Sequence, residues 1–371
     1  MKKLFSFVFF VATMAGAVSC NKNYVAGPEG ADQYNGRLTV RIGTVNETRA
    51  EKASVKDFQI NSLQLFVFDS NNLLETDVYK GDLAAEKSTE LTVNTKTGAK
   101  TVYALINNSR LSLPQGVTTL AQYEAMLTDL GENTAENLVM SGKNTVDVVD
   151  YNNMGTPGST QEVDIFVKRL AAEILLEGVT VDFSSNSLSG ADFSIEKIYL
   201  KNVVGKSPVG MQAITPTADL KSVYPVALTD FSEGNWYNKM KEESGAPACV
   251  SDTFSLPCDV AGEKETVDRA LFTFPNSTEQ DSHNEEWDAR HTRLVIKAHV
   301  TKSSISIDKD TYYVLDLPVL KANTIYKIQN INITMLGKDD DNSDVDSGIG
   351  KVEFSITADD WTETVNLNYE F

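Results

Sequence analysis

The sequence predicts a mostly β fold made of β-sandwiches with one short helix. Three observations support this prediction: many short segments alternate apolar and polar residues, turn-forming stretches separate them, and a single segment has helical periodicity. The chain has 371 residues, which is enough for two ordinary domains with buried cores. We expect the division between them near residues 167–168, just before an apolar run opens a second series of strands.

The first predicted strand is GRLTVRI, which places Leu38, Val40 and Ile42 on one face and polar residues on the other. Turn-rich stretches such as DSNN, NTKTGAK and FSSNSLSG separate the segments that follow. The further predicted strands, in chain order, lie within residues 62–70, 101–109, 162–183, 193–203, 292–302, 311–320 and 323–336.

The predicted helix is TTLAQYEAMLTDLG, residues 118–131. Four apolar side chains recur at helical spacing in it: Leu120, Tyr123, Leu127 and Leu130. Thr119 with Gln122 resembles a capping box at its start, and Gly131 is placed to end it.

The C-terminal part combines an acidic stretch with two strand patterns. Residues 338–350, KDDDNSDVDSGIG, have the composition of a solvated tether. Beyond it, apolar residues alternate in KVEFSIT and in ETVNLNYEF, at Val352, Phe354, Ile356, Val365, Leu367, Tyr369 and Phe371. An unpaired apolar strand templates aggregation, so we expect these strands to pair with their own sheet or with another molecule.

The N-terminus reads as a bacterial export signal. MKKLFSFVFFVATMAGAVSC has two lysines, an apolar run too short to span a membrane, small residues and then Cys20. A cysteine at this place resembles the lipobox of bacterial lipoproteins, which predicts acylation of Cys20 and a lipid tether to a membrane.

The net charge limits the kinds of partner that this protein binds, and the two remaining cysteines raise the question of a disulfide. The formal net charge of −19 argues against nucleic acid as a main partner and favours a solvated surface. Besides Cys20, the chain has only Cys249 and Cys258, in ACVSDTFSLPC. In an oxidising compartment they could close a short loop worth roughly 2–3 kcal/mol, or both could stay free.

Catalytic and metal motifs are not found in the sequence. No G-x-S-x-G, H-E-x-x-H or Walker pattern occurs, so we expect no enzyme and no cofactor. His283, His291 and His299 are spaced by eight residues, which favours surface histidines over a metal site. The acidic tether does not fit a calcium loop, since counting from Asp340 puts Val345 at the glycine position.

Several segments together resemble a known family. The lipobox leader, the polar loop with one arginine after the first strand, VYALINNS, VKRLAAEILLEG, ANTIYKIQNINITMLG and KVEFSITADDWTETVNLNYEF are similar to the fimbrillins. These are the major shaft subunits of type V pili, the fimbrillin-A superfamily. The resemblance implies two transthyretin-like β-sandwich domains with a short helix, plus C-terminal donor strands.

The resemblance also implies a division of the chain. Residues 1–20 would be the lipoprotein signal peptide, 21–49 a propeptide with the removable first strand, 50–167 and 168–337 the two sandwiches, and 338–371 the tether and donor strands. A surface arginine-specific protease would cut between Arg49 and Ala50. A neighbouring subunit's strands would then fill the place of Leu38, Val40 and Ile42, using the seven apolar residues of the C-terminal strands.

This implies a structural shaft subunit of a surface pilus that supports adhesion and biofilm formation. Its partners would be identical subunits in a homopolymer, minor tip and anchor subunits, the protease, the outer membrane through the precursor lipid, and host or bacterial surface receptors. The physical reason is general: a sheet lacking one strand exposes unpaired backbone groups and an apolar groove, and an incoming strand of the same period satisfies both.

Other interpretations remain open at this point. Arg49 could be an ordinary loop residue, and Arg269 is also followed by alanine, although it runs into the probable strand LFTF, where a protease has less access. The chain could be a tip or anchor subunit. It could also be a glycan-binding surface lipoprotein that uses Trp236, Tyr237 or Trp287 as stacking platforms.

Overall fold

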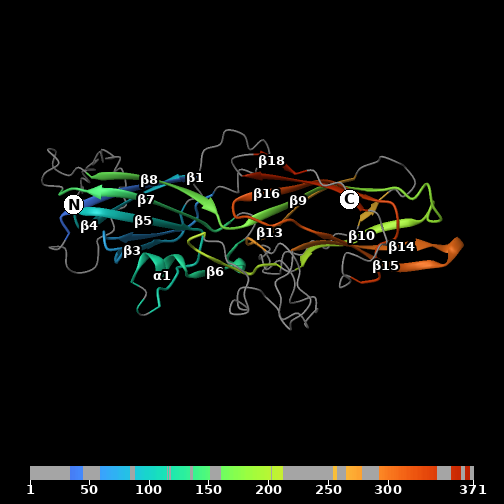
Figure 1. The fold of residues 1–371 in the computed structure, drawn as a ribbon, viewed down its shortest axis with the longest axis horizontal. Coiled ribbons are helices and arrows are strands. Elements are labelled where there is room, and N and C mark those ends of the chain that lie inside the picture. Colours follow the sequence, from blue (N-terminus) through green and yellow to red (C-terminus); the bar gives the residue numbers. More distant parts are fainter. Residues whose placement is uncertain are drawn as a thin grey trace, which may run out of the picture.

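In the part of the chain that the computed structural model describes, the regular structure is mostly strands with very little helix, which confirms the mostly β class. The structure is elongated, and the strands at both ends run roughly along the long axis (Figure 1). No helix in the part that it describes is long and apolar enough to cross a membrane. The residues described are 34–44, 59–83, 88–114, 116, 118–133, 137–150, 160–201, 203–211, 254–256, 265–277, 292–340, 352–360 and 364–367.

The N-terminal half forms a seven-stranded sheet with the order β3-β2-β5-β7-β8-β1-β4. β8 pairs with β7 only near Arg169 and with β1 along most of its length, so the sheet folds over at β8 and closes into two layers. The strands are β1 (Gly36–Thr44), β2 (Leu63–Phe68), β3 (Leu74–Lys80), β4 (Ser88–Thr95), β5 (Gly98–Ile106), β7 (Met140–Val148) and β8 (Gln161–Arg169).

The core of this half lies between the two layers. It is one cluster of buried aliphatic residues from β1, β4 and β8 on one side and from β2 and β5 on the other. Gly142 on β7 lets β8 come close, because a Cβ there would lie 2.5 Å from the backbone oxygen of Phe166. The cluster includes Leu38, Val40, Ile42, Leu63, Leu65, Val67, Leu91, Val93, Val102, Ala104, Ile106, Val163, Ile165 and Val167.

The C-terminal half contains two more sheets, with the orders β12-β10-β14-β15 and β13-β9-β16-β17-β18. The chain passes from β8 to β9 between Arg169 and Ala172. The domain boundary near residues 167–168 stays a prediction. The strands are β9 (Ala172–Val181), β10 (Asp192–Lys201), β12 (Phe254–Leu256), β13 (Glu265–Thr273), β14 (Arg293–Lys302), β15 (Ile307–Asp316), β16 (Thr324–Ile333), β17 (Val352–Asp360) and β18 (Thr364–Leu367), and a 3-10 turn, η7 (Ser303–Ile305), joins β14 to β15.

The two halves share a core where the short strands β6 (Leu127–Asp129) and β11 (Lys206–Pro208) pair with each other. The carbonyl oxygen of Val209 accepts hydrogen bonds from the Tyr103 hydroxyl and from the Ser141 hydroxyl, both at 2.8 Å. Burial raises the pKa of Tyr103 to about 12. A single apolar cluster continues from Tyr103 and Tyr123 into the core of the second half.

The predicted helix is correct at its start and wrong in its extent. α1 spans Leu120–Glu124, and Thr119 and Gln122 form the predicted capping box. The following residues form β6 and a 3-10 turn, η3 (Leu130–Glu132), instead of further helical turns. The reason is tertiary: β6 pairs with β11, and Leu127 is 37% exposed instead of lying on a buried helix face.

Candidate functional site

The first strand is held along both of its edges. β1 pairs antiparallel with β4 over residues 36–43 and parallel with β8 over residues 38–44. It therefore fills a slot between two strands that make no ladder with each other. Removing β1 would leave the facing backbone groups of both neighbours unpaired.

One face of β1 belongs entirely to the core. Leu38 and Val40 are 0% exposed and Ile42 is 1% exposed, as the alternation in the sequence predicted. At roughly 1.5–3 kcal/mol for each buried side chain, the three contribute about 5–9 kcal/mol, an upper bound because unfolded chains already bury some surface. A replacement strand needs the same apolar spacing to fill the slot.

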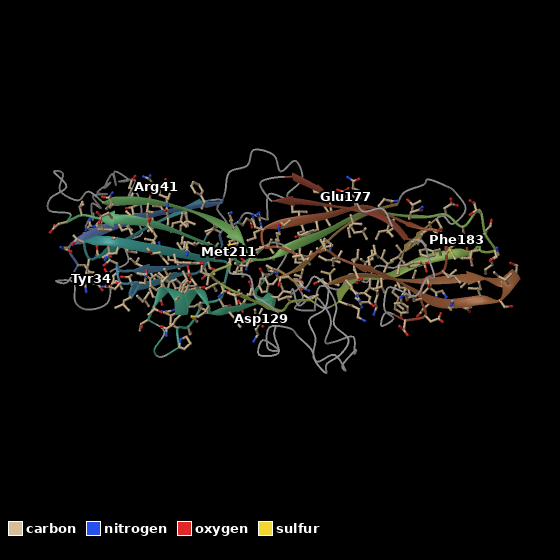
Figure 2. All side chains as sticks on the ribbon, viewed as in Figure 1. Tyr34, Arg41, Asp129, Glu177, Phe183 and Met211 are labelled. Atoms are coloured by element: carbon tan, nitrogen blue, oxygen red, sulfur yellow. The ribbon has the colours of Figure 1, made fainter. Side chains whose placement is uncertain are left out.

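The other face of β1 is polar and bonded to both neighbours. The Thr39 hydroxyl donates to the Thr160 hydroxyl oxygen at 2.9 Å. Arg41 lies on the outer surface (Figure 2), with its guanidinium 3.5 Å from a Glu90 oxygen on β4 and 2.5 Å from a Glu162 oxygen on β8. Glu162 is the main cause of the raised pKa of Arg41. Because these ion pairs are exposed, they contribute little to the stability of the strand.

A buried ion pair holds the C-terminal end of β4. The Glu75 Oε2 on β3 accepts a hydrogen bond from the Lys100 ammonium on β5 at 2.7 Å. The Glu75 Oε1 accepts from the Thr95 hydroxyl at 2.7 Å and from the Lys96 backbone N–H at 2.6 Å. The Glu75 and Lys100 side chains are 7% and 3% exposed. This carboxylate therefore ties β3, β4 and β5 together inside the sandwich.

The predicted donor strands lie at the edge of the chain's own C-terminal sheet. β17 pairs antiparallel with β16, with register shifts between Ile328 and Ile331, and β18 pairs antiparallel with β17. Val352, Phe354 and Ile356 fall in β17, and Val365 and Leu367 fall in β18. The strands predicted from alternation are thus present, and in this structure their partner is their own sheet.

Other predicted site residues lie outside the described residues. These are Cys20, Arg49, Ala50, Cys249, Cys258, Trp236, Tyr237, Trp287, Tyr369 and Phe371. The alternative cleavage site, Arg269, lies in β13, opposite Leu176. The same strand includes Leu271, Phe272 and Thr273 of the predicted strand LFTF. Most of the predicted tether is also outside, but its first residue, Lys338, makes two backbone hydrogen bonds with Tyr312, at 2.8 and 2.9 Å.

In the part of the chain that the structure describes, one of the three histidines lies beside two carboxylates, a combination that could in principle bind a metal ion. His299, Glu196 and Asp310 bring one ligand atom each within 4.8 Å of one another. The ammonium of Lys297 already bonds both carboxylates, at 2.6 Å from Glu196 and 2.7 Å from Asp310. Hydrogen bonding to Asp310 is the main cause that raises the pKa of His299. This arrangement is a surface ion-pair network.

Comparisons with known proteins agree with this geometry. Residues 36–169, which are the whole seven-stranded sheet, match the model of a family described as "Major fimbrial subunit protein (FimA)". No curated protein sequence matches the chain.

Solved structures share the fold over most of the chain. A fimbrilin from Porphyromonas gingivalis W83 is 16% identical with a TM-score of 0.57, covering 90% of this chain and 99% of that one. A putative cell adhesion protein from Bacteroides eggerthii is 17% identical with a TM-score of 0.58, covering 88% and 96%. Another from Parabacteroides distasonis is 15% identical with a TM-score of 0.59, covering 88% and 99%. The family match and the shared β-sandwich fold confirm the resemblance of this chain to the type V pilus fimbrillins.

Proposed function

We propose that this protein is a structural shaft subunit of a surface pilus, polymerised by strand exchange. The precursor is exported as a lipoprotein through Cys20, anchored in the outer membrane and cut after Arg49 by an arginine-specific surface protease. The mature subunits form a homopolymer with minor tip and anchor subunits, and the fimbrium on the cell surface supports adhesion to receptors and biofilm formation. The match of residues 36–169 to the FimA family supports this proposal.

The observation that carries the proposal is the position of β1. β1 is inserted between β4 and β8 and buries Leu38, Val40 and Ile42. Arg49 follows the strand by only a few residues in the sequence. A cut there detaches the strand covalently while leaving the rest of the chain intact, and an incoming strand then restores both ladders and the core.

The donor is best assigned to the last segment, residues 363–371. β18 has four register partners on β17, whereas β17 has eight on β16. Releasing β18 and the residues after it therefore breaks fewer backbone contacts than releasing both strands. The remaining β17 keeps the edge of β16 covered, which limits aggregation of the donating subunit.

Cleavage is tested by Arg49→Ala in cells that carry the surface protease. The variant should accumulate as a lipidated, unpolymerised precursor, while wild-type mature protein should begin at Ala50. Arg110→Ala is a matched control, because Arg110 is exposed and lies in the segment that follows β5 instead of the one that follows β1. N-terminal sequencing and the heat-resistant ladder on a gel are the measurements. Normal fibres from Arg49→Ala would exclude this processing site.

The donor assignment is tested by two substitutions that add the same charge. Alternation puts Leu367 and Asn366 on opposite faces of the strand, so Leu367→Asp should block assembly and Asn366→Asp should be tolerated. Deleting residues 363–371 should also abolish assembly while both halves stay folded. Filaments are counted by electron microscopy after protease treatment. A full ladder from the deleted protein would require another donor.

A further inference from the structure

β4 depends on β1 for its place in the sheet. In the described part of the chain, β4 is the last strand of its sheet order and forms a ladder with β1 alone, over eight register partners. If β1 leaves, as the proposed function requires, β4 loses this whole ladder at once. The wall of the empty slot would then be a strand without any backbone partner in the sheet.

Besides the turn that joins β4 to β5, two contacts of β4 in the described part of the chain do not involve β1. Leu91 and Val93 are each 1% exposed and pack in the core, so their alternation specifies which face of β4 is buried, but apolar packing is not directional. The second contact is directional: Glu75 Oε1 accepts hydrogen bonds from the Thr95 hydroxyl and the Lys96 N–H, at the end of β4. Glu75 reaches from β3, in the opposite layer, so this bond does not depend on β1.

The electrostatics of Glu75 match an anchoring role. Burial raises the pKa of this carboxyl, but the hydrogen bonds from Lys100, Thr95 and Lys96 outweigh burial and leave the pKa below its ordinary value. A buried ion pair is often no more stabilising than apolar residues of the same volume, so stability alone does not explain its use here. Its distinctive property is a fixed geometry between three strands.

We propose that Glu75 is a positioning residue that holds β4 in register after β1 has left, so that the incoming strand meets a formed slot. This inference rests on the proposed function. Lys100 keeps the Glu75 carboxylate charged and oriented through Oε2, and Oε1 faces the end of β4. The precursor needs the anchor little, because β1 then supplies the eight register partners.

Two double variants of the full chain separate anchoring from general stabilisation. Glu75→Gln with Lys100→Met keeps an oxygen that can accept from Thr95 and Lys96, whereas Glu75→Met with Lys100→Met keeps none. Both remove the ion pair and have similar side-chain volumes. The amides of residues 88–95 should exchange hydrogen alike in the two uncut proteins.

After the proteins are cut with an arginine-specific protease, the two variants should differ in the hydrogen exchange of β4 and in assembly. The Met/Met variant should exchange the β4 amides about tenfold faster than the Gln/Met variant and lose most of its ladder, while the Gln/Met variant should assemble like wild type. If the Met/Met variant does not fold, Thr95→Val removes one of the two bonds to Oε1, and it should give a smaller change in the same direction.

The outcomes are distinguishable. Equal β4 exchange and equal assembly of the two cut variants would overturn the anchoring role and leave the proposed function intact. If cut wild-type protein neither releases its first segment nor assembles, the proposed function fails and this inference fails with it. Slower assembly of the Met/Met variant with unchanged exchange in β4 would also contradict the inference.

Discussion

Leu38→Ala gives the most direct measure of how strongly β1 is built into the precursor. Leu38 is 0% exposed and packs in the cluster between the two layers of the first sandwich. Truncating such a side chain removes its transfer free energy and leaves a cavity, so the uncut full chain should lose about 2–5 kcal/mol of unfolding free energy. Urea unfolding followed by far-ultraviolet circular dichroism, which reports on the strands themselves, measures this change, with the slope checked for two-state behaviour.

Arg41→Ala on the same strand is the matched control. Arg41 faces solvent and its ion pairs with Glu90 and Glu162 are exposed, so its loss should cost only about 0.2–1 kcal/mol. If Leu38→Ala changed the unfolding free energy by less than Arg41→Ala, β1 would not be a core strand of the precursor. In cut protein that has released its first segment, both substitutions should be silent.

Two further predictions concern packing and pH. Gly142→Ala places a Cβ 2.5 Å from the Phe166 backbone oxygen and should cost about 1–3 kcal/mol, whereas Gly43→Ala meets nothing within 4 Å and should be nearly neutral in the same urea assay. His299 has a raised pKa through its hydrogen bond to Asp310, so its contribution is present below about pH 6.5, its unfolded pKa, and is lost as pH rises through the folded value. Between pH 6 and 8.5, the unfolding free energy of the wild type should therefore fall by about a few tenths of a kcal/mol more than that of His299→Gln, a small amount because the pair is partly exposed. Equal shifts of the urea midpoint in both proteins over this pH range would contradict the prediction.

The parts of the fold that follow from local pattern were predictable. Alternation in GRLTVRI predicted both the strand β1 and its buried face, Leu38, Val40 and Ile42. The Thr119–Gln122 pair predicted where α1 begins, because capping depends on neighbours in the chain. Its end was not predictable in the same way, since β6 is selected by pairing with β11, a segment far along the chain.

The anchor of β4 shows what local pattern cannot give. Glu75 and Lys100 lie 25 residues apart, on strands where charged residues normally face solvent, and nothing in their neighbours marks them as buried. Similarly, alternation predicted the strands β17 and β18 but not their partner, because any apolar edge or slot of matching period satisfies the same pattern. Only the three-dimensional arrangement distinguishes these cases.

The double pairing of β1 also has a mechanical consequence. A strand pulled sideways from one edge opens its ladder one hydrogen bond at a time, but a strand pulled along its own axis between two neighbours loads all its bonds together. The slot between β4 and β8 runs roughly along the long axis of the molecule (Figure 1). If a neighbour's strand fills that slot in a fibre whose axis follows the long axis of the subunit, tension along the fibre acts on the joint in shear. The lifetime of such a joint under tension is set by the rate of forced unfolding and not by its equilibrium dissociation constant. A fibre of this kind therefore resists flow over short times far better than its affinity alone would suggest.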